Sequence, residues 1–233
     1  MKAPKKEKKK ESGVANWKKA LAIVAGVLFV VLMIVSSMGM SWISGIAPAK
    51  PGDTATLLYT VWDDQGRPVL TTDPRIFNET WGKENIVFLA SPIQMVVNST
   101  TSDLFAPMPA QLPRAGEVQF ALLGEEANRI SQGLVGMRDG ETKRISLDLG
   151  DPMETDITND QFSQMFGNST AKVVAGKQFI RVLTDQPAIN LDPNVTLPEY
   201  YRVFYFKSIN ADGYTLKYGY TSADVTLYRL NGR

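Results

Sequence analysis

The sequence predicts an α+β protein with an N-terminal transmembrane helix, followed by a part made mostly of short strands with one short helix among them. Three observations lead to this prediction. Residues 20–42 contain no charged side chain. Beyond them, short runs of β-branched and aromatic residues alternate with polar ones, as half-buried strands do. Between two such runs, over residues 125–137, apolar residues recur at helical spacing.

The uncharged segment 20–42 predicts the transmembrane helix. A helix of this length would measure roughly 34 Å, enough to cross a hydrocarbon core of about 30 Å. Trp17 and Trp42 stand near its two ends, where interfacial tryptophans are typical. A cleaved signal peptide is the alternative, because residues 47–49 resemble a small-residue cleavage site, although the apolar region of a signal peptide is shorter, about 7–15 residues.

Charge is segregated along the chain. Residues 1–19 carry eight Lys and two Glu, which leaves 17 basic and 22 acidic residues in the remainder. A basic run can bind nucleic acid or anionic lipid, but lysines on one side of an apolar span orient a membrane helix. We therefore expect a basic cytoplasmic tail at 1–19, a linker at 43–53 and an extracytoplasmic C-terminal part. The protein would be a single-pass protein of the cell membrane, with the lipid bilayer and not nucleic acid as a partner.

Four sequons agree with an external location. Asn78, Asn98, Asn168 and Asn194 each begin an Asn-x-Thr triplet without proline at x, and all four follow the apolar span. Such triplets are acceptors for N-glycosylation in exported proteins. We expect a glycoprotein; the alternative is plain surface Asn-x-Thr.

The composition excludes several classes of chemistry. The chain has no Cys and no His, so disulfides, thiolate nucleophiles, Ser-His-Asp triads and histidine-ligated metals are excluded. The acidic run at 151–160 lacks the spacing of a calcium loop. The adjacent pairs Asp63-Asp64 and Glu125-Glu126 do not place two carboxylates across a cleft. We expect neither a metal nor a cofactor, and a membrane-anchored hydrolase would lack a nucleophile and base.

The elements after the linker follow in order. Residues 54–62 alternate as a strand, a turn at 63–66 leads to an extended run at 67–70, and together they predict a hairpin. Residues 71–115 contain two sequons and five prolines, and predict an extended insertion with one or two strands. A further strand is expected at 117–123.

The segment 133–147 joins a helix end, a tight turn and a strand. Ala127, Ile130 and Leu134 fall on one face of the short helix that precedes it. Gly140 can adopt the positive φ of the turn. Alternating polar and apolar residues follow, so the sequence predicts strand, short helix, turn and strand in succession.

Three blocks in this order resemble the FKBP-type peptidyl-prolyl cis-trans isomerases, or rotamases. Residues 52–69 resemble the family's opening strand and its acidic-Gly turn, and residues 118–124 resemble a later strand. Residues 133–147 carry the Gly-Leu-Val-Gly-Met-x-x-Gly-Glu pattern. The region 155–219 is similar to the branch of the family that has an insert-in-flap β domain.

The resemblance implies a domain organisation. An FKBP-like domain, with an antiparallel sheet wrapped on a short helix, would cover 54–154 and 220–233, with 71–115 as an extended insertion. The insert-in-flap-like β module, an inserted small β domain, would cover 155–219. In that family the insert is the chaperone part. Residues 201–206 would form a strand that grips extended chains; a buried central strand is the alternative.

The resemblance also implies a function: membrane-anchored isomerisation of X-Pro bonds and help with protein folding for unfolded or proline-containing client proteins. The barrier to rotation is about 20 kcal/mol. A twisted amide is less polar than a planar one, so a dry apolar pocket favours it without a nucleophile, metal or cofactor. The alternative is a non-catalytic surface binding or chaperone module that kept the fold and lost the site.

Carried over residue by residue, the resemblance implies an apolar pocket. Leu70 stands where the family has an aspartate and Met153 near its flap tyrosine, so two polar contacts are lost. Each position could instead be ordinary core. The implied catalytic positions are Tyr59, Val69, Phe120, Ile130 and Met153, and the implied substrate-binding positions are Leu70, Ala127 and Val225.

Overall fold

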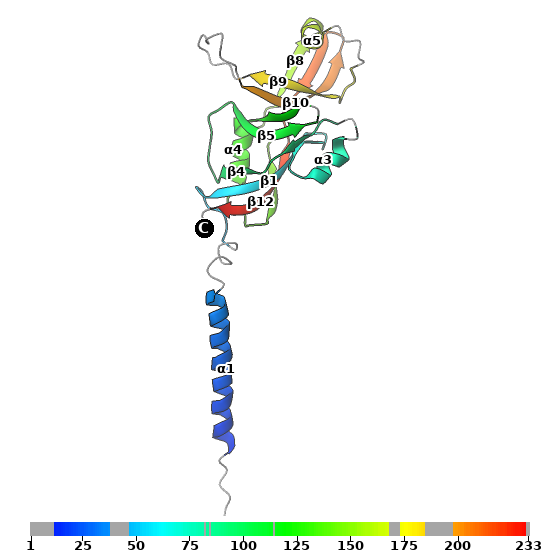
Figure 1. Cartoon of the computed structure of the whole chain (residues 1–233). Helices are drawn as coiled ribbons and strands as arrows, with labels where there is room; N and C mark the ends of the chain where they lie inside the picture. The colour runs from blue at the N-terminus through cyan, green and yellow to red at the C-terminus, as the bar shows by residue number, and fades with distance from the viewer. Residues whose placement is uncertain are drawn as a thin grey trace, which may run out of the picture. The chain divides into compact units, whose positions relative to one another are not determined.

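The computed structural model describes residues 12–37, 47–81, 83, 85–113, 115–167, 173–184 and 198–231. The chain divides into two compact units, residues 1–46 and residues 47–233, and the first contains helix α1 (Ser12–Ser37) (Figure 1). None of the helices in these ranges combines the length and the apolarity needed to span a membrane. The transmembrane helix predicted at 20–42 is therefore corrected: α1 begins inside the basic segment and ends at Ser37, and residues 38–42 lie outside the described ranges.

In the part of the second unit that the structure describes there are twelve strands and three short helices. The helices are α3 (Pro74–Trp81), α4 (Gly124–Gly133) and α5 (Asn159–Phe166). The strands are β1 (Thr54–Trp62), β2 (Pro68–Thr71), β3 (Phe88–Ala90), β4 (Ile93–Val96), β5 (Phe105–Leu112), β6 (Gly116–Leu123), β7 (Thr142–Ser146), β8 (Glu154–Thr158), β9 (Gln178–Thr184), β10 (Glu199–Asn210), β11 (Gly213–Lys217) and β12 (Ser222–Asn231).

All twelve strands belong to one curled sheet. Ten follow a single path, β7-β12-β1-β2-β3-β5-β6-β10-β11-β8, while β4 pairs with β1 and β9 pairs with β10. The chain is mostly β, with 44% strand and 24% helix. The predicted α+β class with a separate inserted β domain is therefore wrong. The strands expected to form their own domain continue the main sheet, because β10 pairs in parallel with β6 through Tyr200–Gln119 and Tyr201–Phe120.

Several local predictions are confirmed. β1 covers the whole of the strand predicted at 54–62, and β2 pairs antiparallel with it, which makes the predicted hairpin. β6 and α4 lie where a strand and a short helix were expected. The hairpin and the helix place their apolar faces in one core, since Leu57, Val61 and Leu134 belong to the same buried cluster.

The corner after α4 depends on two glycines. A Cβ atom at Gly133 would lie 2.5 Å from the Cδ1 atom of Ile145 on β7, so only glycine permits this close approach. Gly140 has φ +79°, in the left-handed region that favours glycine. Its N–H donates to the carbonyl oxygen of Leu227 on β12 at 2.7 Å, which fixes the turn against the sheet.

Residues 47–53 of the predicted linker and the predicted insertion are both part of this unit, while residues 43–46 lie outside the described ranges. Ala49 is buried, and its N–H donates to the carbonyl oxygen of Met137 at 2.7 Å. The region 71–115 holds one helix and three strands where one or two strands were expected. β5 pairs with β6 along eight residue pairs, so this region is part of the sheet.

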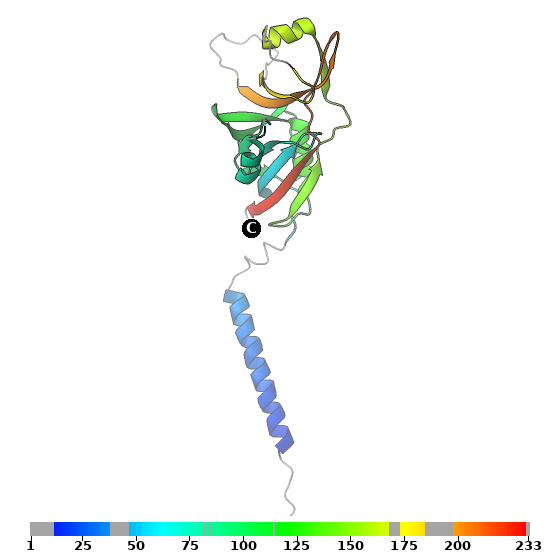
Figure 2. The same cartoon turned by 90° about the vertical axis from the view of Figure 1, so that its right-hand side faces the viewer.

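The described parts of residues 154–217 contain β8, α5, β9, β10 and β11, and these five elements are named here the distal segment. They lie together at the end of the sheet remote from β12 (Figures 1 and 2). They have an aromatic core of their own, in which Phe162 stacks on Tyr214 with ring centroids 4.3 Å apart. Within this segment β10 is central, since β9 and β11 pair with it. The predicted grip strand at 201–206 is therefore a buried internal strand.

Candidate functional site

The residues expected to line a prolyl pocket are buried, and most of them share one core cluster. None of the eight is more than 8% exposed. Ala127 and Met153 are buried outside the main cluster. The six that share this cluster are Tyr59, Val69, Leu70, Phe120, Ile130 and Val225.

Tyr59 does not offer its hydroxyl to an open rim. The Oη atom donates to the carbonyl oxygen of Ser91 at 3.4 Å. Burial raises the pKa of the Tyr59 phenol well above its ordinary value, so the group stays neutral. The side chain is a satisfied core tyrosine, and it has no free donor for the carbonyl of a client.

Met153 occupies a special backbone position at the start of the distal segment. Its φ is +50°, and it packs so closely on Gly219 that an added Cβ there would lie 2.7 Å from the Met153 Cβ. Met153 and Tyr220 line a cavity of about 360 Å³ with the loop 148–152. No other residue of the predicted site lines this cavity.

A buried ion pair, which the sequence did not predict, lies beside the predicted pocket residues. Arg202 on β10 and Glu126 on α4 are both fully buried. The Nη2 atom of Arg202 donates to Oε1 of Glu126 at 2.6 Å, and Nη1 donates to Oε2 at 2.9 Å. This bidentate geometry is the strongest that a guanidinium and a carboxylate form.

The rest of the Arg202 guanidinium is also bonded. Nε and Nη2 donate to the carbonyl oxygen of Tyr218 at 2.9 and 2.6 Å, and Nη1 donates to that of Ala121 at 2.8 Å. The guanidinium carbon lies 4.2 Å from the centre of the Tyr220 ring, a cation–π contact. Every N–H donor of the Arg202 guanidinium is therefore bonded, and its side chain occupies the space between α4, β6 and Tyr220.

The charge of Arg202 is held by its surroundings. Burial lowers the pKa of the guanidinium and is the largest single effect. The charge and hydrogen bonds of Glu126, together with Tyr220 and Tyr218, outweigh it, and the net effect raises the pKa of Arg202 above its ordinary value. Glu126 has a second task, because its Oε2 accepts the N–H of Leu123 at the start of α4 at 2.9 Å. One carboxylate thus fixes both the helix N-terminus and the arginine.

The signal for this site was present in the sequence. Arg202 is the only charged residue in the run 200–206, and the other six residues of this run are aromatic or apolar. A charge inside a strand that is buried on both faces needs a partner. The partner Glu126 lies 76 residues away, a distance that no local pattern spans.

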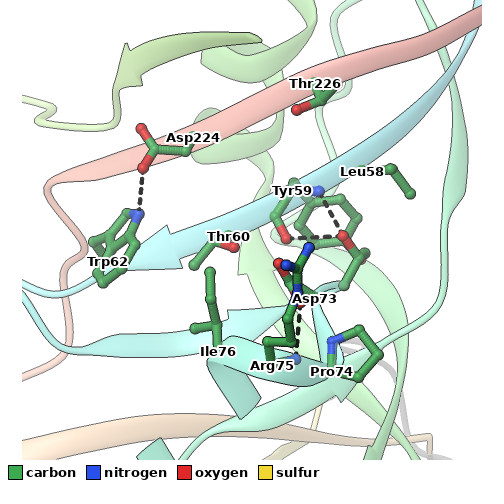
Figure 3. A pocket seen from close by; sticks show the side chains of 11 residues that line it. Leu58, Tyr59, Thr60, Trp62, Asp73, Pro74, Arg75, Ile76, Asp224 and Thr226 are labelled. Atoms are coloured by element: carbon green, nitrogen blue, oxygen red, sulfur yellow. Dashed lines mark hydrogen bonds and ion pairs between the residues drawn. The ribbon is translucent and has the colours of Figure 1, made fainter. Parts of the chain in front are cut away.

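Figure 3 shows an open cavity of about 560 Å³ at β1 and β12, beside the start of α3. Tyr59 is the one residue of the predicted prolyl site that lines it. The indole Nε1 of Trp62 donates to Oδ2 of Asp224 at 2.9 Å, and the Arg144 guanidinium binds the same carboxylate at 2.6 Å. The hydrogen bonds from Arg144 and from Trp62 lower the pKa of Asp224. This carboxylate is therefore ionised and engaged, and it cannot act as a general acid near neutral pH.

The acidic pair Asp63-Asp64 has structural roles. Asp63 accepts hydrogen bonds from Arg67 Nε at 2.8 Å and from Gln178 Nε2 at 3.2 Å. Asp64 binds Tyr205 and Lys217 of the distal segment. Among the residues that the structure describes, no group of three or more Asp or Glu side chains could hold a metal ion.

Two of the predicted glycosylation sites can be located. Asn78 on α3 and Asn98 after β4 are both exposed. Asn98 has φ +57°, which asparagine tolerates better than most residues. Asn168 and Asn194 lie outside the described ranges.

Comparison with known proteins adds no family assignment. No protein-family model matches the chain, and no curated protein matches it significantly. The likeness to the FKBP-type isomerases therefore remains a prediction from the sequence.

Proposed function

We propose that the unit from Ala47 onward is a non-catalytic module that binds extended, unfolded segments of client proteins and keeps them from aggregating. The observation that carries this proposal is the filled interior. The eight positions expected to form a prolyl pocket are buried, and Arg202 fills the space beside them with every donor bonded. Isomerisation needs room for a prolyl ring in a dry apolar cavity, so this interior favours holding over catalysis.

Strand β9 is the surface best suited to an extended chain. In the ranges that the structure describes, β9 pairs only with β10, so its other edge has unpaired backbone donors and acceptors. A free edge of this kind accepts an added strand from another polypeptide. Val182 on β9 is 46% exposed, and Leu183 and Phe179 lie half-buried at the rim of the distal aromatic core. The backbone would give affinity for any sequence, and these side chains would favour apolar clients.

We place this unit outside the cytoplasm. All four sequons of the chain, at Asn78, Asn98, Asn168 and Asn194, lie in this unit. The two sequon asparagines that can be located, Asn78 and Asn98, are accessible to a glycosylating enzyme. Clients would then be exported proteins that are not yet folded.

A matched pair of substitutions tests the binding surface. Val182→Lys puts a charge on the β9 edge, which blocks strand addition. Val96→Lys is the control, because Val96 is 43% exposed on another edge strand, β4. With the full-length protein and a chemically unfolded client, we expect Val182→Lys to lose most of the suppression of aggregation and Val96→Lys to keep it. Equal activity of the two variants would reject the β9 surface.

A further inference from the structure

We name the part of the unit outside the distal segment the inner sheet. We infer that the inner sheet contains a guanidinium-binding site, and that Arg202 of the distal segment fills this site. Arg202 then acts as a latch, that is, a contact that holds the distal segment against the inner sheet. The site itself comes from outside β10. Glu126 is on α4, the carbonyl of Ala121 is on β6, and Tyr218 and Tyr220 lie between β11 and β12. Only the guanidinium comes from the distal segment.

The chemistry of the site is selective for a planar cation. Two carboxylate oxygens and two carbonyl oxygens accept all the bonds of the fork, and the Tyr220 ring covers one face at 4.2 Å. A lysine ammonium has neither the bidentate geometry nor the flat face. A neutral planar molecule such as urea has the shape without the charge that Glu126 requires.

The latch is one of several attachments between the distal segment and the inner sheet. Val203 on β10 belongs to the main buried cluster, and Oε1 of Gln178 on β9 accepts the N–H of Ile86 at 2.8 Å. β10 and β6 share two residue pairs. The Tyr220 hydroxyl bonds to both the N–H and the carbonyl oxygen of Val203, each at 3.2 Å. On the opposite side, Asp64 binds Tyr205 and Lys217, and Arg67 binds the carbonyl of Gly176. We therefore expect loss of the Arg202 contacts to loosen β10 against β6 and α4, while these other contacts still hold the distal segment to the inner sheet.

The central variant is Arg202→Ala in the full-length protein, and the readout is hydrogen exchange of backbone amides. We expect amides of β9 and β10 to exchange about a hundredfold faster, since breaking a buried ion pair is strongly destabilising. Amides of β1 and β12 should keep their protection. A rise of the same size in β1 and β12 would show a general loss of core packing and would overturn the latch.

Chemical rescue tests the ligand class. Ethylguanidinium added to Arg202→Ala should slow exchange in β9 and β10 again, while urea at the same concentration should not. Arg202→Met fills the cavity with an apolar side chain, and ethylguanidinium should have no effect on it. Absence of rescue in Arg202→Ala, or rescue of Arg202→Met, would reject the site.

A second readout applies if Arg202→Ala does not fold unaided. Ethylguanidinium should then restore native near-UV circular dichroism to this variant. Arg144→Ala is the control, because Arg144 is also bidentate to a carboxylate but is 65% exposed. It should show neither faster exchange in the distal segment nor a response to ethylguanidinium. Recovery that urea supports equally well, or a response of Arg144→Ala, would contradict a built guanidinium site.

Discussion

Replacement of Arg202 by methionine should be among the most destabilising single changes in this protein. The substitution removes both bonds to Glu126 and the three bonds to the carbonyl oxygens of Tyr218 and Ala121. Glu126 would keep one bond, from the N–H of Leu123, and would otherwise be a buried unpaired carboxylate.

The magnitude follows from that unpaired charge. Breaking a buried pair by removing one partner costs about 3–5 kcal/mol, a large part of the roughly 5–15 kcal/mol by which a domain is stable. With a urea dependence of about 2 kcal/mol/M, the urea concentration at which β9 and β10 lose their hydrogen-exchange protection should fall by about 2 M in Arg202→Met, while that of β1 and β12 should stay near the wild-type value. Hydrogen exchange at a series of urea concentrations measures both midpoints.

The double variant Arg202→Met/Glu126→Leu distinguishes the cost of the unpaired charge from the cost of altered side-chain packing. Two apolar side chains of similar volume should recover much of the loss, because replacement of a whole buried pair is often neutral. Arg144→Met is the surface control and should change both midpoints little. A loss of less than about 1 kcal/mol for Arg202→Met would contradict this prediction, because it would mean that Glu126 is not left as an uncompensated buried charge in the variant.

Three further predictions follow from other parts of the chain. Gly124→Ala would place its Cβ against the carbonyl oxygen of Asp103, and thermal unfolding should show a loss of about 1–3 kcal/mol, as for overpacking. The pKa of Asp224 is lowered in the folded state, so the ionised side chain stabilises the fold above its unfolded pKa, and this stabilisation is lost as pH falls through the folded pKa. In thermal melts between about pH 6 and pH 2, the stability of Asp224→Asn should therefore fall less with acid than that of the wild type. An unchanged acid dependence would contradict this. Intact mass of protein from a glycosylating host should show glycans at Asn78 and Asn98 that the Asn→Gln variants lose, and unmodified wild type would reject the proposed location.

Local patterns were enough to predict the inner strands and the short helix. The alternation in 54–62 and the helical spacing of Ala127, Ile130 and Leu134 reflect burial on one face, which a local pattern records. The glycines of the corner were also informative, because Gly140 adopts the positive φ expected of it.

Other features could not be predicted because they depend on distant partners. β5 contains Pro107 and Pro109, which argue against a strand, yet both are exposed while Met108 and Ala110 between and after them are buried. The pairing of β10 with β6 made one sheet where two domains were expected. The same pairing brings Arg202 to Glu126, and so fills the interior that the family resemblance predicted to be open.

The central claim is that this interior has no room for a prolyl ring, and the rate of a proline-limited refolding reaction tests it most directly. The client should be one whose slow phase reports X-Pro isomerisation, with the full-length protein added in catalytic and then in equimolar amounts. We expect the rate of the proline-limited slow phase to stay unchanged while the protein suppresses aggregation of the client. A rate that rises in proportion to the added protein would contradict it and would support the isomerase prediction.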